Sequence, residues 1–215
     1  ATVAQATTIE NAGNDGSNTY DITDTATNIA ASTSAFLTKA GTVTVSGTAN
    51  KTQADTISAF TKAVTYNISD TAANITAATA QARNEAGDIT STSDALFAEA
   101  KAISDATNGG SDVYNVNDTT AAIVAGIISD STALLGAGIR TANDNATFSQ
   151  ALTMAGLSKE IVYNISDTAA NIPGSVNQGL HEAVNITLTN NVTFAKAKVV
   201  DDATNSGTNT YNIED

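Results

Sequence analysis

Short stretches of alternating apolar and polar residues recur along this chain, each followed by residues at helical spacing. In one such stretch Tyr66 and Ile68 fall on one face of a strand, and the polar residues beside them fall on the other. Small apolar residues then follow at helical spacing: Ala72, Ile75, Ala78, Ala82 and Ala86. Gly87 ends this pattern, which therefore predicts a half-buried strand followed by one helix.

The stretch 66–75 (YNISDTAANI) belongs to a repeated motif. It recurs unchanged at 163–172 and in altered form at 20–29 and 114–123, and a fifth copy begins at 211. All five tyrosines occupy its first position: Tyr20, Tyr66, Tyr114, Tyr163 and Tyr211. They lie 46, 48, 49 and 48 residues apart (66−20, 114−66, 163−114, 211−163). A fixed period over the whole chain predicts a stacked repeat array.

A second extended run lies in the middle of each repeat: 42–46, 88–92, 138–142 and 185–189. Helical spacing returns after these runs, and two further faces are predicted to be buried: Leu96, Ala100 and Ile103, and Phe148, Leu152 and Ala155. Because a helix-length crossover separates the strands, we expect them to be parallel. The predicted fold is an α/β solenoid with a β-α-β-α repeat of about 48 residues. An all-β solenoid (β-helix) is the alternative, since Thr, Asn and Ser are frequent.

The repeat register predicts one elongated array over residues 1–215. Its divisions are a partial repeat 1–19, repeats 20–65, 66–113, 114–162 and 163–210, and a partial repeat 211–215. Neither end has the features of a capping repeat, so we expect an internal segment whose uncapped ends favour self-association. Two positions depart from the pattern. Ala122 replaces an asparagine, and Pro173 limits the first helix of its repeat to a single turn or a restart near Ser175.

The charge of the chain excludes some partners. Asp and Glu number 22 against 9 Lys and Arg, which gives a net charge of −13. A polyanion repels nucleic acid and anionic lipid, and no apolar run is long enough to span a membrane. Cysteine is absent, which excludes disulfides and thiolate chemistry. Aromatic residues make up only 5%, so we expect repeated backbone pairing, more than one large core, to stabilise the fold.

One aspartate recurs in every copy of the motif: Asp24, Asp70, Asp118, Asp167 and Asp215. An aspartate between a strand and a helix suits a helix N-cap, which is the simpler interpretation. The alternative is a row of carboxylates that binds calcium. Calcium takes six to eight oxygen ligands, so Asn67, Ser69 or backbone oxygens would have to contribute. The glycine-rich nonapeptide of calcium-binding β-rolls is not present.

Asn28, Asn74 and Asn171 also share one motif position and could form an amide ladder between stacked repeats. We expect each motif tyrosine to supply a large buried contact with its hydroxyl at a polar edge. If the five rings were exposed, they would instead form a stripe for carbohydrate stacking or self-association. Catalytic residues are not predicted: His181 is the only histidine, no nucleophile motif accompanies it, and we do not expect an enzyme or a required cofactor.

The YNISDTAANI motif and its period resemble the degenerate repeats of very large secreted bacterial surface proteins of S-layer-like, haemolysin-type and adhesin-type classes. The resemblance covers essentially the whole chain and implies export and display outside the cell. We therefore expect a structural or adhesive repeat segment that assembles end to end into a fibre or lattice. A module that binds calcium or a surface glycan is the alternative. Ice binding through threonine rows is a third hypothesis, weakened because the threonine positions differ between repeats.

Overall fold

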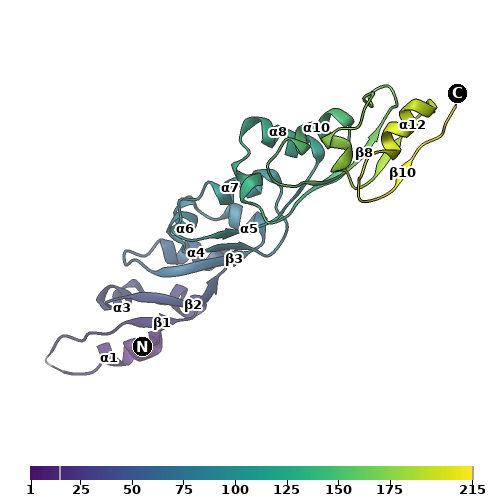
Figure 1. Cartoon of the computed structure of the whole chain (residues 1–215). Helices are drawn as coiled ribbons and strands as arrows, with labels where there is room; N and C mark the ends of the chain where they lie inside the picture. Colours follow the sequence, from purple (N-terminus) through teal and green to yellow (C-terminus); the bar gives the residue numbers. More distant parts are fainter. Residues whose placement is uncertain (15, 215) are drawn as a thin grey trace. The chain divides into compact units, whose positions relative to one another are not determined.

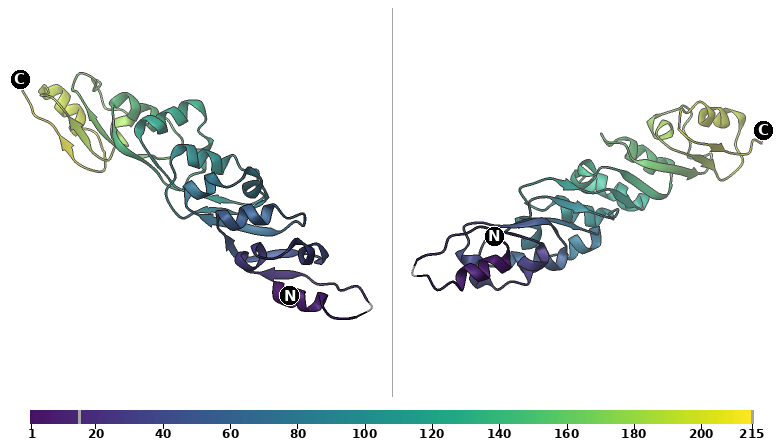
Figure 2. Two further views of the ribbon diagram at one scale, coloured as in Figure 1. Left: turned by 180° about the vertical axis from the view of Figure 1, so that it is seen from behind. Right: turned by 90° about the horizontal axis from the view of Figure 1, so that it is seen from below.

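The computed structural model describes residues 1–14 and 16–214 and contains two compact units. Unit 1 comprises 1–94 and 101–114, and unit 2 comprises 95–100 and 115–215. Each unit is a mixed α/β structure with one parallel sheet, and neither sheet closes into a barrel. The helices of each unit lie along one side of its strands (Figures 1 and 2).

In unit 1 the five strands pair in chain order, each parallel to the next. The strands are β1 (Ile22–Asp24), β2 (Val43–Ala49), β3 (Thr65–Asp70), β4 (Ile89–Ser91) and β5 (Asp112–Val113). The helices are α1 (Val3–Glu10), α2 (Ala26–Ala30), α3 (Ser34–Lys39), α4 (Lys51–Ser58), α5 (Ala72–Ala77) and α6 (Ala80–Glu85). Helix α7 (Phe97–Ser104) begins in unit 2 and ends in unit 1.

Unit 2 has the same order of pairing. Its strands are β6 (Val116–Asp118), β7 (Arg140–Ala146), β8 (Val162–Asp167), β9 (Ile186–Leu188) and β10 (Asn209–Thr210). Its helices are α8 (Thr120–Ser129), α9 (Thr132–Gly136), α10 (Phe148–Ala155), α11 (Gln178–His181) and α12 (Phe194–Asp201). Helices connect the strands, so the all-β alternative is wrong.

The two units repeat one another at a spacing of 97 residues. Strands β7, β8, β9 and β10 begin 97 residues after β2, β3, β4 and β5 (140−43, 162−65, 186−89, 209−112). The long strands β2 and β7 share an irregularity: a register shift follows Thr44 in one and Thr141 in the other. Gly47 lies within the first of these shifts at φ 90°, a conformation that favours glycine. Repeats with long and short second strands therefore alternate.

Apolar and polar residues alternate along the strands, so one face of each sheet packs against the helices and forms the core. Tyr66 and Ile68 are 2% and 1% exposed, while Asn67 and Ser69 on the opposite face are half-buried, as predicted. The helices contribute fully buried alanines to the same core: Ala54, Ala72 and Ala82 in unit 1 and Ala151 in unit 2. Alanine lets a helix approach the sheet closely, which is why a chain poor in large side chains still buries its apolar residues.

The predicted helix over 72–86 is divided in two. Ala78 is extended at ψ 154°, and Thr79 is the N-cap of a new helix, where its hydroxyl accepts from Ala82 N at 3.1 Å. Asp55 of α4 holds this break, because its carboxylate accepts from Thr79 N at 2.8 Å. The alanine-rich sequence alone would continue the helix. It ends here because the Thr79 side chain caps a new helix and the Thr79 N–H has an acceptor, Asp55, in a different helix.

Two predicted helix faces are wrong in part. Leu96 precedes α7 and is 50% exposed, although Ala100 and Ile103 are buried as predicted. In α10, Leu152 is 48% exposed, and Met154 lies in the core instead. Alanine-rich helices offer several apolar faces of similar width, so spacing alone does not identify the buried one. The interruption at Pro173 is confirmed, since the next helix, α11, begins at Gln178.

Candidate functional site

Four motif aspartates each join two elements of the fold, and we call them the aspartate clasps. The Oδ2 atom of each accepts the N–H of the first residue in the helix that precedes its own strand. These pairs are Val3 with Asp24 (2.9 Å), Lys51 with Asp70 (2.9 Å), Phe97 with Asp118 (2.8 Å) and Phe148 with Asp167 (2.9 Å). The first N–H groups of a helix have no partner within it, and a negative charge there is favourable.

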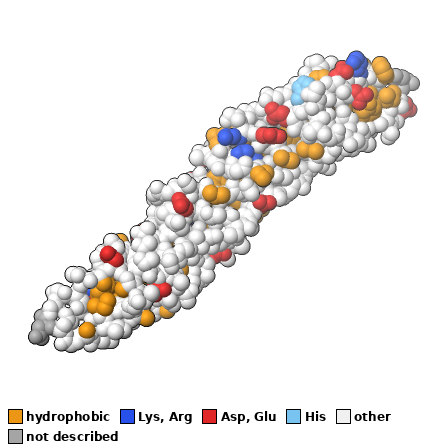
Figure 3. Space-filling model, turned by 60° about the horizontal axis from the view of Figure 1, so that its bottom comes forward, with side chains coloured by type: hydrophobic (Ala, Val, Ile, Leu, Met, Phe, Trp, Pro, Cys, Tyr) orange, Lys and Arg blue, Asp and Glu red, His pale blue; other side chains and the backbone are white. Residues whose placement is uncertain are grey.

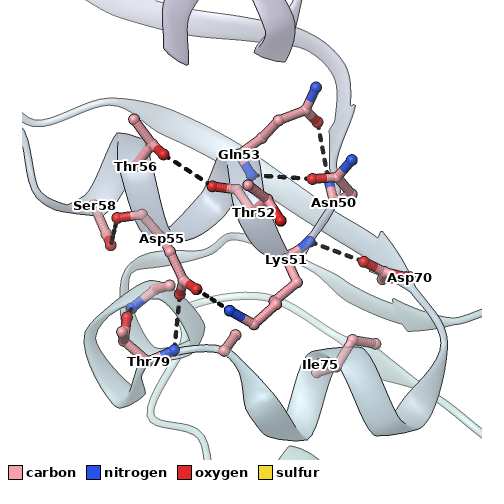
Figure 4. Close-up of polar contacts among 12 residues, drawn as sticks. Asn50, Lys51, Thr52, Gln53, Asp55, Thr56, Ser58, Asp70, Ile75 and Thr79 are labelled. Carbon is pink, nitrogen blue, oxygen red and sulfur yellow. Dashed lines mark hydrogen bonds and ion pairs between the residues drawn. The ribbon is translucent and has the colours of Figure 1, made fainter.

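The other carboxylate oxygen holds the motif itself together. In the clasp of Asp70, Oδ1 accepts from Thr71 N and from Asn74 Nδ2, each at 2.8 Å. Figure 4 shows this carboxylate beside the first turn of α4, where Lys51 N donates to it. The Lys51 ammonium points elsewhere, to Asp55 at 2.7 Å. The carboxylate therefore receives three N–H donors from two consecutive helices.

The clasps have lowered pKa values where a shift is resolved. Burial alone would raise the pKa of Asp24, Asp70 and Asp167, but the N–H donors outweigh it and leave each pKa below its ordinary value of 3.8. Asp24 and Asp167 are each only 8% exposed. These carboxylates are thus held in the charged form by the hydrogen bonds that connect the elements.

The predicted N-caps are one residue off. The caps are Thr25, Thr71 and Thr119, whose side chains accept from the helix N–H three residues later. Each clasp aspartate precedes its cap and caps the previous helix in the chain instead. The carboxylate can reach the previous helix because the strand that ends in the aspartate lies beside the first turn of that helix. The spacing of the motif in the sequence does not reveal this contact. Asp215 lies outside the described residues.

The predicted asparagine ladder between repeats also differs from the structure. Asn28, Asn74 and Asn171 each donate to the aspartate four residues earlier in the same motif, at 2.8, 2.8 and 2.7 Å. Ala122 stands at this position in the remaining copy, so the clasp of Asp118 lacks that amide. These asparagines orient the clasp carboxylate and do not link one repeat to the next.

A different set of residues forms a ladder between adjacent strands, and we call it the Asx ladder. Each member has an Oδ1 atom that accepts a backbone N–H from the following strand connection. The pairs are Asp21 with Thr42 (2.7 Å), Asn67 with Asp88 (2.9 Å), Asp88 with Ser111 (2.8 Å), Asn115 with Ile139 (2.9 Å), Asn164 with Asn185 (3.1 Å) and Asn185 with Thr208 (2.8 Å). An Asx residue directly after the motif tyrosine was the sequence signal for Asp21, Asn67, Asn115 and Asn164, whereas Asp88 and Asn185 follow no tyrosine.

Glycine makes room for this ladder. A Cβ atom built on Gly87 would lie 2.5 Å from Asn67 Oδ1, and one on Gly41 would lie 2.7 Å from Asp21 Oδ1. At Gly207 the same atom would meet Asn185 Oδ1 at 2.4 Å. Each of these glycines directly precedes the residue whose N–H is accepted, so the close approach of side chain and backbone requires glycine there.

The motif tyrosines are mostly core residues. Tyr66, Tyr114 and Tyr163 are 2%, 4% and 1% exposed, so the predicted buried contact is confirmed and a stacking stripe through these rings is not available. The Tyr66 hydroxyl donates to Ala82 O at 2.8 Å, and that of Tyr163 donates to Gly179 O at 3.0 Å. Burial, with a smaller contribution from the nearby Glu85 charge, raises the pKa of Tyr66 to about 12.

Tyr20 and Tyr211 are half-buried. The Tyr20 hydroxyl donates to Phe36 O at 3.1 Å, sixteen residues on, as in the buried copies. A hydrogen bond with Asp201 raises the pKa of Tyr211, with burial adding to the shift.

Acidic side chains do not gather into a metal-binding group within residues 1–14 and 16–214: no three Asp, Glu or His side chains there come together as ligands. On the face seen in Figure 3, acidic residues are scattered among uncharged side chains. His181 is exposed, and its Nδ1 accepts from Thr204 N at 3.1 Å. No helix in the described part of the chain is long and apolar enough to cross a membrane.

Comparison with known protein families, with curated proteins and with solved structures finds no match to this chain.

Proposed function

We propose that this chain is a structural repeat segment whose strands and helices stack as an α/β solenoid. The observation that carries this proposal is the aspartate clasp, which occurs in four consecutive copies with the same donors and nearly the same distances. Each clasp satisfies a helix N–H with a carboxylate from the next repeat half. The second half of each of these repeats is then incomplete without the repeat that follows it, which is the property of a stacked array.

Two further features support a repeated stacking role. Strands pair in chain order within each sheet, and the Asx ladder adds a side-chain hydrogen bond between successive strands. The residue two positions after the clasp aspartate receives a similar link from a later side chain, at the start of α5 (Ala72) and in the turn that begins at Ala169. Ser93 Oγ accepts from Ala72 N at 3.1 Å, and Asn190 Oδ1 accepts from Ala169 N at 2.8 Å.

The setting we propose is an extracellular bacterial surface protein, in which such a segment acts as a spacer or adhesive array. This part of the proposal rests on the resemblance of the repeated motif, and the absence of cysteine is compatible with it. End-to-end association belongs to the same proposal. We do not propose calcium binding at the clasp aspartates, because their carboxylate oxygens already accept N–H groups.

The test is to lengthen the chain by one structural period. A second copy of residues 66–162, which is 97 residues, is inserted between Val162 and Tyr163 so that long and short strands still alternate. Four added strand layers at about 4.8 Å each should lengthen the particle by about 19 Å. Small-angle scattering measures the maximum dimension, and thermal melting followed by circular dichroism measures stability.

We expect the lengthened chain to melt at or above the temperature of the unchanged chain. A control with the same 97 residues in scrambled order should lose cooperative melting. The proposal is wrong if the ordered insertion leaves the maximum dimension unchanged or unfolds like the scrambled control.

A further inference from the structure

The face of the second sheet that points away from its helices carries two parallel rows of uncharged polar side chains. Ser166, Thr187 and Thr210 lie in register on β8, β9 and β10. Two residues earlier on each strand connection lie Asn164, Asn185 and Thr208. Neighbouring members of a row are separated by the strand spacing of about 4.8 Å, and the rows by about 6.6 Å along the strands. We call these six residues the hydroxyl–amide face.

The row of Asn164, Asn185 and Thr208 is held in place by hydrogen bonds, whereas the hydroxyls of the row formed by Ser166, Thr187 and Thr210 have no partner among the described residues. Asn185 Nδ2 donates to Asn164 Oδ1 at 2.9 Å, and Asn185 Oδ1 accepts from Thr208 N at 2.8 Å, so the amide row is locked. Within the described residues, the hydroxyls of Ser166, Thr187 and Thr210 make no hydrogen bond to another residue. Three aligned groups that both donate and accept are thus presented in fixed positions.

We propose that the hydroxyl–amide face binds a neutral polysaccharide that runs across the strands. None of its six residues is ionisable, although the chain carries a net charge of −13. The negative charge of the rest of the molecule repels a polyanion, and the face has no charged residue to attract a charged ligand. The face is therefore suited to an uncharged ligand. Sugar hydroxyls donate and accept as Ser and Thr hydroxyls do, and a linear polymer repeats along a row as the strands do.

A second copy of the chain fits this face less well. Three strands at about 4.8 Å and four residues at about 3.3 Å give an area of about 190 Å². A stable protein interface needs about 800 Å² on each partner. A polymer avoids this limit, because many weak contacts along one chain add up. Without an aromatic ring on this face, the affinity of a single site should be on the order of millimolar.

This inference rests on the extracellular setting proposed above and deepens it by naming the partner. The test is native electrophoresis of the unchanged chain through gels that contain hydroxyethyl cellulose, a neutral polymer, or carboxymethyl cellulose, an anionic one. We expect retardation by the neutral polymer relative to a polymer-free gel, and none by the anionic polymer. Thr187→Ala should weaken binding about two- to tenfold for the loss of one neutral hydrogen bond, and adding Thr210→Ala should weaken it further.

Thr52→Ala is the matched control, because it removes an exposed hydroxyl from α4, a helix of unit 1 that contributes no residue to the hydroxyl–amide face. It should be retarded like the unchanged chain. The inference fails if the unchanged chain is not retarded, or if the Thr187→Ala/Thr210→Ala variant is retarded as strongly as Thr52→Ala. It also fails if sedimentation shows a dimer of the unchanged chain that the double variant loses, since the face would then bind a second copy. In each of these cases the variant with the 97-residue insertion can still fold and be longer than the unchanged chain. Failure of polysaccharide binding is therefore distinguishable from failure of the proposed solenoid.

Discussion

Replacing Asp70 with asparagine should uncouple α4 from the motif that follows it. The carboxylate accepts from Lys51 N at 2.9 Å and from Thr71 N and Asn74 Nδ2 at 2.8 Å. An asparagine keeps the shape but has only one acceptor oxygen, so its amide N–H₂ must face either Lys51 N–H or the Asn74 amide. The N–H on the side that the amide nitrogen faces loses its acceptor and meets a donor instead, and the favourable charge at the start of α4 is lost.

The magnitude follows from these losses. A hydrogen bond to a charged group contributes about 1.5–3 kcal/mol, and an anion at a helix N-terminus about 0.3–1 kcal/mol. Asp70 is only partly buried, so water replaces part of the loss. We expect Asp70→Asn to reduce the free energy of unfolding by about 2–3 kcal/mol, measured by urea denaturation followed by circular dichroism.

Asn74→Ala is the companion variant, because it removes one donor and keeps the charge. It should cost about 0.5–1.5 kcal/mol, and the double variant should cost less than the sum of the two single changes. The reasoning is refuted if Asp70→Asn unfolds within about 0.5 kcal/mol of the unchanged chain, a difference ordinary for surface substitutions.

Three further outcomes follow from the same geometry. Gly87→Ala should destabilise the chain by about 1–3 kcal/mol in urea denaturation, because its Cβ would meet Asn67 Oδ1 at 2.5 Å, whereas Gly13→Ala, with nothing within 4 Å, should not. Tyr66→Phe should cost about 0.5–1.5 kcal/mol in the same assay, since Ala82 O would lose its donor; an unchanged midpoint would contradict this. The carboxylates of Asp24, Asp70 and Asp167 have lowered pKa values, so the stability they contribute is complete above their ordinary value of 3.8 and is lost as the pH falls through the folded value. Melting temperature measured from pH 6 to pH 2 should therefore fall less steeply for Asp70→Asn than for the unchanged chain.

Periodicity predicted the strands, the parallel pairing and the buried tyrosines, because these depend on residues close together in the chain. The alternation around Tyr66 and the break at Pro173 are local features of this kind. The division at Ala78 was not predicted, because it depends on an acceptor, Asp55, that belongs to a different helix. Periodicity also cannot distinguish one apolar face of an alanine-rich helix from another, as Leu152 shows.

The candidate site was predicted only in its residue types. The motif identified the recurring aspartates and asparagines, but it could not show that Asp70 reaches the preceding helix while Asn74 turns back to Asp70. Those partners are determined by which strand lies beside which helix. The Asx ladder had a visible signal in Asn67 and its equivalents. The missing clue was the glycine, such as Gly87, that precedes the donating residue in five of the six pairs; Val184 stands there in the pair of Asn164 with Asn185.

Amide hydrogen exchange of the unchanged chain tests most directly whether carboxylates tie each helix to the next repeat half. The N–H groups of Val3, Lys51, Phe97 and Phe148 each open a helix, where an amide ordinarily has no partner and exchanges quickly. With the clasps formed, we expect these four amides to be protected as well as the strand amides beside them. Those of Val3, Lys51 and Phe148 should lose protection together as the pH falls through the lowered pKa values of Asp24, Asp70 and Asp167. Exchange of these amides at the rate of an unstructured peptide near neutral pH would contradict the account.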